Sequence, residues 1–165
     1  MPAPFEESAV VLKRAVAAGL LGGLTMAIAA VILTAAHGGD TWLPLKMPSA
    51  AIYLQRALEP GFDAGPVVLG ILCHLAVSIV WAIIYGYLVH GLSAPAAMAI
   101  GPLWGLVAGA AMTFGVLPLL SLTRLRDDMP FGSTVVEHLV FGAFIALPFV
   151  LPKVAIGARR TQPAH

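Results

Sequence analysis

The feature that most constrains this chain is the length of its uncharged stretches. No Lys, Arg, Asp or Glu occurs in residues 15–39, 64–123 or 138–152, so three windows hold 100 of the 165 residues. A helix that crosses a bilayer needs about 20 apolar residues. Only helices and closed barrels satisfy the backbone in lipid, and an unbroken apolar run is typical of the helix. We therefore expect an all-α membrane protein.

The overall composition agrees with a membrane location and narrows the function. Charged residues make up 10% of the chain and the mean hydropathy is +0.93, whereas soluble domains carry about 25% charged residues. The net charge of +1 gives no electrostatic basis for binding nucleic acid. No Ser-His-Asp arrangement, phosphate-binding loop or HExxH pattern is present. These observations favour a protein that is not an enzyme.

Four membrane spans are expected, at about residues 15–36, 67–89, 96–120 and 135–156, within a single membrane domain over residues 1–165. The 60-residue window is too long for one helix. It is divided at residues 90–95, where Gly ends one helix and Ser with a nearby Pro starts the next. This short connection predicts an antiparallel hairpin. The expected fold is a bundle of four transmembrane helices packed through Gly and Ala.

The loop between the first two spans is expected to contain a short amphipathic helix at residues 48–59. Its apolar face comprises Ala51, Leu54 and Leu58, and its polar face comprises Gln55, Arg56 and Glu59. Such a helix lies in the membrane interface or caps the bundle. An ordinary surface helix would show the same pattern, so both interpretations stay open.

The distribution of basic residues favours both termini on the cytoplasmic side. In that orientation five basic residues lie inside and four lie outside, which is the direction of the positive-inside rule. The inner residues are Lys13, Arg14, Lys153, Arg159 and Arg160, and the outer residues are Lys46, Arg56, Arg124 and Arg126.

Small residues recur at every fourth position of the spans. Positions four apart lie along one helix face, and small residues let the backbones of two membrane helices approach closely. In spans two and four the same spacing includes His74 and His138, so both histidines are expected on packing faces. The glycines expected at helix contacts are Gly19, Gly23, Gly101, Gly105, Gly109 and Gly142.

Four polar residues are expected to converge in the outer half of the bundle. They are His74, Thr113, Glu137 and His138. Ionisable residues inside a bilayer are costly and are functional candidates by default. Structural explanations also exist, because Thr134-x-x-Glu137 matches a capping box that would start the last span. A hydrogen bond from His74 to a neighbouring helix would likewise account for that histidine.

Three kinds of function are compatible with these residues. The first is a structural or accessory subunit, packed against itself or against a larger membrane complex, because packing motifs are abundant and catalytic groups are scarce. The second is a small transporter or proton-conducting protein that uses His74 and His138, since imidazole can relay protons near neutral pH. The third is a haem or metal carrier, although the spacing matches no strong ligand motif. No cofactor is predicted.

Each of the four expected spans contains a short motif. The motifs are Ala18-Gly19, His74-x-x-x-Ser78-Ile79-Val80-x-Ala82 with Tyr85, Trp104-Gly105 followed by Ala108-Gly109, and Glu137-His138-Leu139-Val140. Together they resemble the YagU-like family of small bacterial inner-membrane proteins. The resemblance extends over about residues 15–150 and implies a four-helix protein of the inner membrane, with no implied reaction. Glu137 stands where the family pattern has Gly before the histidine, and the first loop is shorter.

Overall fold

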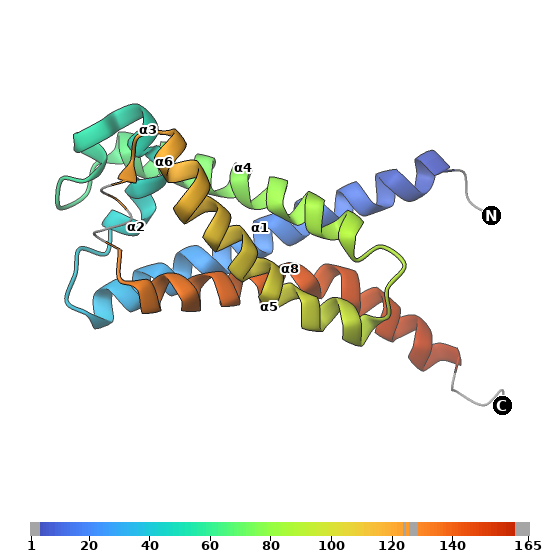
Figure 1. Cartoon of the computed structure of the whole chain (residues 1–165). Helices are drawn as coiled ribbons and strands as arrows, with labels where there is room; N and C mark the ends of the chain where they lie inside the picture. Colours follow the sequence, from blue (N-terminus) through green and yellow to red (C-terminus); the bar gives the residue numbers. More distant parts are fainter. Residues whose placement is uncertain (1–3, 124, 126–128, 161–165) are drawn as a thin grey trace.

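The protein folds into four long helices that run back and forth along one direction, as the computed structural model in Figure 1 shows. The structure describes residues 4–123, 125 and 129–160, and the side chains of residues 9–151 within those ranges. The described residues contain no strand, and the expected all-α fold with four helices of membrane-spanning length is confirmed. The long helices are α1 (Pro4–Ala36), α4 (Ala64–Leu88), α5 (Ala94–Ala111) and α8 (Phe131–Arg160).

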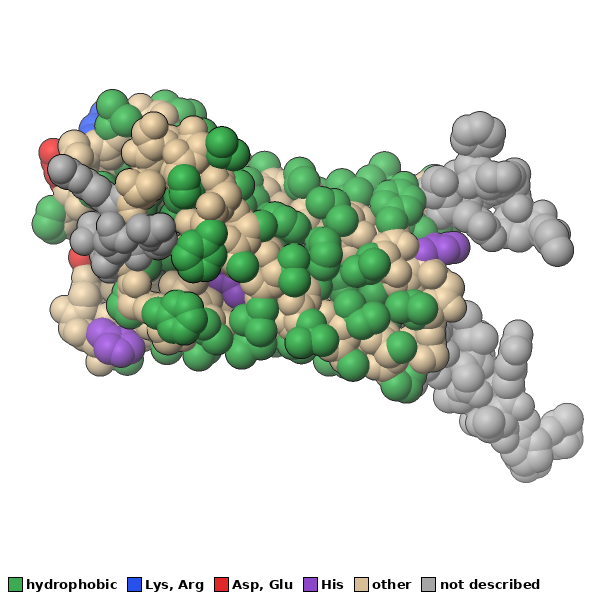
Figure 2. All heavy atoms as spheres, viewed as in Figure 1, with side chains coloured by type: hydrophobic (Ala, Val, Ile, Leu, Met, Phe, Trp, Pro, Cys, Tyr) green, Lys and Arg blue, Asp and Glu red, His purple; other side chains and the backbone are tan. Residues whose placement is uncertain are grey.

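Each of the four helices contains a segment that is long and apolar enough to cross a membrane. These segments are Ala9–Ala36, Ala64–Leu88, Ala94–Leu119 and Phe131–Leu151. The third segment continues beyond α5 through a π-helical turn, η3 (Met112–Val116), and the short helix α6 (Leu117–Leu119). Figure 2 shows hydrophobic side chains over the flank of the bundle, with the visible acidic and basic groups at one end.

Local signals in the sequence explain where α4 and α5 begin and end. The Asp63 side chain caps α4 by accepting a hydrogen bond from the Gly65 N–H, and Ser93 caps α5 in the same way. Between the two helices, Gly91 has a φ of +82°, a conformation that a residue without Cβ adopts freely. The chain therefore reverses within the five residues 89–93.

The α4–α5 hairpin is antiparallel as expected, but its two helices splay apart. They contact each other mainly near their connection, whereas α1 packs along both α4 and α8, and α8 packs along α5. The reason is the direction of the small residues: Gly101 and Gly105 of α5 face α8 rather than α4. The bundle is thus ordered α4, α1, α8, α5 in space.

Direct backbone contact joins α5 to α8. A Cβ placed on Gly101 would lie 2.5 Å from the carbonyl oxygen of Gly142, and one placed on Gly142 would clash with the Gly101 carbonyl. Further along α5, a Cβ on Gly105 would overlap the carbonyl oxygen of His138. Any larger residue at these positions would push the two helices apart.

Helix α1 presents two adjacent small faces to its two neighbours. Gly19 and Gly23 lie against Ile79 and Ser78 of α4, where a Cβ on Gly19 would come within 2.5 Å of the Ile79 Cα atom. Gly22, one position away, lies against Ile145 of α8. Because successive helical residues differ by about 100° in direction, α1 holds two helices at once.

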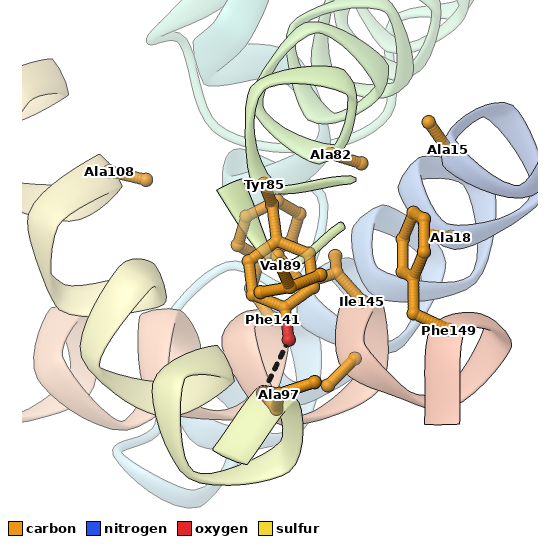
Figure 3. Close-up of a cluster of buried hydrophobic side chains, with 11 residues drawn as sticks. Ala15, Ala18, Ala82, Tyr85, Val89, Ala97, Ala108, Phe141, Ile145 and Phe149 are labelled. Atoms are coloured by element: carbon orange, nitrogen blue, oxygen red, sulfur yellow. Dashed lines mark hydrogen bonds between the residues drawn. The ribbon is translucent and has the colours of Figure 1, made fainter. Parts of the chain in front are cut away.

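The main hydrophobic core lies where all four helices approach one another (Figure 3). Tyr85 of α4 is fully buried there, and its hydroxyl donates a hydrogen bond of 2.6 Å to the Ala97 carbonyl of α5. The indole N–H of Trp104 donates to the Trp81 carbonyl, and the two indole rings meet edge to face at 5.6 Å. These contacts tie α4 to α5 near their connection.

The loop after α1 forms a cap, here defined as residues 37–63, at the end of the bundle opposite the termini (Figure 1). The single helix expected at residues 48–59 is wrong. Leu54 has a φ of +49°, which breaks the segment, and its side chain is 64% exposed. The cap consists of α2 (Leu43–Lys46), η1 (Met47–Ser49), α3 (Ala50–Tyr53) and η2 (Leu54–Ala57).

The cap packs between the ends of α4 and α6. The Leu45 carbonyl of the cap sits directly on Gly70 of α4, at a distance that leaves no room for a Cβ. On the other side, the buried residues Ala50 and Ala57 pack against Leu125, which follows α6. The cap therefore occupies the space that opens where α4 and α5 diverge.

Buried charge holds the cap together. The Lys46 side chain is fully buried and donates to the carbonyl oxygens of Glu59 and Gly61, and its Nζ lies 3.8 Å from Asp40. Desolvation raises the pKa of Asp40, but hydrogen bonds from the N–H groups of Trp42 and Gly61, together with Lys46, outweigh it and lower the pKa overall. The cap is thus cross-linked through its own backbone.

A second ion pair joins the cap to the start of α4. Arg56 donates two hydrogen bonds to Asp63, of 2.6 and 3.0 Å. The hydrogen bond from Arg56 is the main cause that lowers the pKa of the Asp63 carboxyl, which also caps α4. Because this folded-state pKa is depressed, the contribution of Asp63 is present above its ordinary pKa and is lost as the pH falls through the lowered value.

Replacing Gly105 with Ala is expected to lower the free energy of unfolding by about 1–3 kcal/mol, because the added Cβ would overlap the His138 carbonyl. Gly132→Ala is the matched control on α8, since a Cβ there meets no atom within 4 Å. Helix propensity alone favours Ala in both variants. Unfolding in mixed detergent micelles, followed by circular dichroism, measures the difference; equal stability of both variants would contradict the close approach of α5 and α8.

Candidate functional site

His74 lies on the face of α4 that contacts α1. Its Nε2 atom is 2.9 Å from the carbonyl oxygen of Gly23. A carbonyl oxygen only accepts, so Nε2 must carry the proton and donate it. The contact is possible because Gly23 lacks a side chain that would cover its own backbone.

His138 lies on the other side of the bundle, between α8 and α5. Its ring packs directly on Gly109, and the side chain is only 8% exposed. The Nδ1 atom is 2.8 Å from the carbonyl oxygen of Thr134, one turn earlier in the same helix. By the same reasoning, Nδ1 is the nitrogen that donates.

The two histidines occupy different helix contacts, His74 between α4 and α1 and His138 between α8 and α5. Within the described part of the chain, the Nδ1 of His74 and the Nε2 of His138 make no hydrogen bond. A neutral imidazole in each position therefore keeps one unused lone pair. Such a pair of groups can accept protons or hydrogen bonds from a solute.

Glu137 does not form the expected capping box. Helix α8 already begins at Phe131, and the Thr134 hydroxyl donates back to the Pro130 carbonyl at 3.2 Å instead of capping the helix. Glu137 is consequently nearly two turns inside the helix. Its half-buried carboxylate has no hydrogen bond or ion pair to any described residue, and its oxygens are not enclosed by the protein.

Thr113 lies within the π-helical turn η3 and is half-buried. Turns of this kind are frequent at functional sites. Pro118 offers an ordinary cause for the distortion, because it lacks an N–H and cannot complete a regular helical turn. No hydrogen bond joins Thr113 to either histidine or to Glu137 among the described residues. Among the described residues, no hydrogen bond or ion pair joins any two of the four expected residues, so the expected convergence is not seen in their contacts.

The structure also shows an open cavity of about 470 Å³ between the end of α1 and the start of α8. It is lined by Leu33, His37, Pro130, Gly132, Ser133 and Val136. Sequence reasoning missed this cavity, because the position of α8 beside α1 depends on contacts between helices about a hundred residues apart. In the sequence, His37 and Pro130 are the residues of this cavity that stand out, because one is polar and the other breaks helices.

The geometry gives little support to a metal site. Within the described residues, no three His, Cys, Asp or Glu side chains lie close enough to hold a metal ion. Cys73 is a half-buried free thiol next to His74 in sequence. None of the contacts among the described residues therefore favours a haem or metal carrier.

Comparison with known proteins adds no assignment: no family model, curated protein or solved structure matches this chain.

Opposite tautomers are expected for the two histidines when both are neutral. His74 should carry its proton on Nε2, and His138 should carry it on Nδ1, because each donates to a carbonyl oxygen. Nitrogen-15 NMR of the histidine-labelled protein in bilayers at alkaline pH distinguishes a protonated from an unprotonated ring nitrogen. His90, at the exposed end of α4, serves as the internal reference. The same tautomer at both positions would contradict one of the two contacts.

Proposed function

We propose that the protein is a non-enzymatic membrane subunit that acts by packing against a second membrane protein, or against another copy of itself. In this proposal the bundle is rigid, because GxxxG-type packing brings the backbones of α5 and α8 into direct contact. A rigid bundle with apolar flanks is suited to support a neighbouring helix rather than to change shape during a reaction.

The main support for this proposal is the Glu137 carboxyl group, which lies inside an apolar span without a partner in the part of the chain that the structure describes. An ionisable side chain inside a bilayer normally pairs with another group or faces water. Glu137 lies within the apolar segment Phe131–Leu151 and has no partner among the described residues. A native assembly that supplies the missing partner removes this cost.

The proposal places the protein in a bacterial inner membrane with both termini in the cytoplasm, as a relative of the YagU-like family. Both termini lie at the same end of the bundle, away from the cap (Figure 1). Two of the four basic residues assigned to the outer side, Lys46 and Arg56, are held by local carbonyls or carboxylates. Arg124 and Arg126 lie outside the described residues.

Extraction of the protein with its native lipids tests the proposal. Polymer-bounded native discs followed by native mass spectrometry should show the chain in a stoichiometric complex with itself or with another integral membrane protein. A monomer without any protein partner, at native expression level, would overturn the proposal.

A second function is favoured by the free ring nitrogens of the two histidines. Each imidazole keeps one nitrogen without a hydrogen-bond partner among the described residues. A proton-conducting protein or small transporter could use them as relay groups. The close glycine contacts around both rings argue for protons rather than for a large solute.

Proton flux in liposomes decides on this second function. The wild-type protein should dissipate an imposed pH gradient, and the double variant His74→Gln, His138→Gln should lose most of that flux. His90→Gln is the matched control, since His90 is exposed beyond the end of α4. Equal flux in the wild type and the double variant would eliminate a role for these histidines.

A further inference from the structure

The position of Glu137 on α8 shows from which direction a partner can reach it. The neighbouring His138 points toward α5, and Phe141 is buried against Gly22 of α1. Glu137 is half-buried at the edge of this α1–α8 contact, and the preceding Val136 is 45% exposed. The carboxylate therefore lies at the boundary between the α1–α8 contact and the lipid-facing surface.

The lining of the open cavity between α1 and α8 includes residues within one helical turn of Glu137. Ser133 lines the cavity and precedes Glu137 by four residues, so the two side chains lie on one helix face, one turn apart. The apolar segment of α8 begins at Phe131, which places Glu137 about 9 Å inside it at 1.5 Å per residue. A long side chain entering from the flank could reach this depth.

Among the residues that the structure describes, no Lys or Arg is available to Glu137 at that depth. Between residues 15 and 39, and again between 64 and 123, there is no Lys or Arg. The described basic residues of the cap are already occupied, because Lys46 is buried on backbone carbonyls and Arg56 is paired with Asp63. Charge complementarity therefore points outward, to a group on another molecule.

We infer that the edge of α8 at Glu137, together with the α1–α8 cavity beside it, is a docking surface for a transmembrane helix that carries a basic side chain at the depth of Glu137. This inference rests on the proposed function as a subunit and names the chemistry of the partner. Paired with a Lys or Arg inside the bilayer, the carboxylate gains a hydrogen-bonding partner that none of the described residues provides. Neighbouring Gly132 and Ser133 leave room for a close approach.

A synthetic helix tests this surface without knowledge of the natural partner. The probe is a Leu/Ala transmembrane peptide with a single Lys about six residues from each end, so that either orientation presents one Lys at the right depth. A dansyl group on the peptide accepts energy from the tryptophans of the protein in phosphatidylcholine vesicles. The Lys peptide should associate about three- to fifteenfold more tightly with the wild type than with Glu137→Gln.

Two controls make the result specific. The same peptide with Leu in place of both Lys residues should show no difference between the wild type and Glu137→Gln. Glu59→Gln removes a carboxylate from the exposed cap and should bind the Lys peptide like the wild type, because Lys46 contacts only the backbone of Glu59. Equal binding of the Lys peptide to the wild type and Glu137→Gln would overturn the inference.

A measurement on the unaltered protein covers the case in which the variant does not fold. Dicyclohexylcarbodiimide dissolves in the bilayer, and a protonated carboxyl adds to it: the carboxyl oxygen bonds to the central carbon and the proton moves to nitrogen. Peptide mapping by mass spectrometry should find this adduct on Glu137. The Lys peptide should suppress the adduct and the Leu peptide should not. Modification that is unaffected by the Lys peptide would overturn the docking surface, even if native discs still show a complex.

Discussion

The rest of the fold depends on the approach of helix backbones at positions without side chains. In lipid there is no hydrophobic difference between a helix surface and its surroundings, so association relies on close packing and on hydrogen bonds between helices. Helix α8 makes this contact on two sides, with Gly142 against Gly101 of α5 and with Ile145 against Gly22 of α1. A larger residue at any of these glycines would push the facing helices apart.

The same glycine contacts explain how polar side chains are accommodated inside the bundle. Where a glycine lies on a helix face, its backbone carbonyl is open to a donor from the next helix, as the Gly23 carbonyl is to His74. Tyr85 and Trp104 likewise bond to carbonyls of the facing helix rather than to side chains. These three polar side chains therefore donate to backbone carbonyl oxygens. An ionised Glu137 has no proton to donate, so a backbone carbonyl cannot be its hydrogen-bond partner.

The windows without charged residues, together with the Gly, Ser and Pro residues that end and start helices, were sufficient to predict an all-α fold with four membrane-spanning helices. The reason is that lipid permits so few other structures. The neighbours of each helix could not be predicted. The four-residue spacing of small residues places Gly101 and His138 on packing faces of their helices, but it does not indicate which neighbouring helix each face contacts. The single helix predicted at residues 48–59 was wrong because the chain breaks at Leu54. The buried residues on either side of that break, Ala50 and Ala57, pack in one cluster with Leu125, a contact that a helical pattern in residues 48–59 does not reveal.

The spatial order α4, α1, α8, α5 has a consequence for the way the chain assembles. During synthesis α5 follows α4 immediately, but its packing surface is turned away from α4 and toward α8, which is made later. Until α8 arrives, the glycine face of α5 has no helix of its own chain to contact. Helix α8 therefore joins the pair α1–α4 to α5, and without it the glycine face of α5 is exposed to lipid.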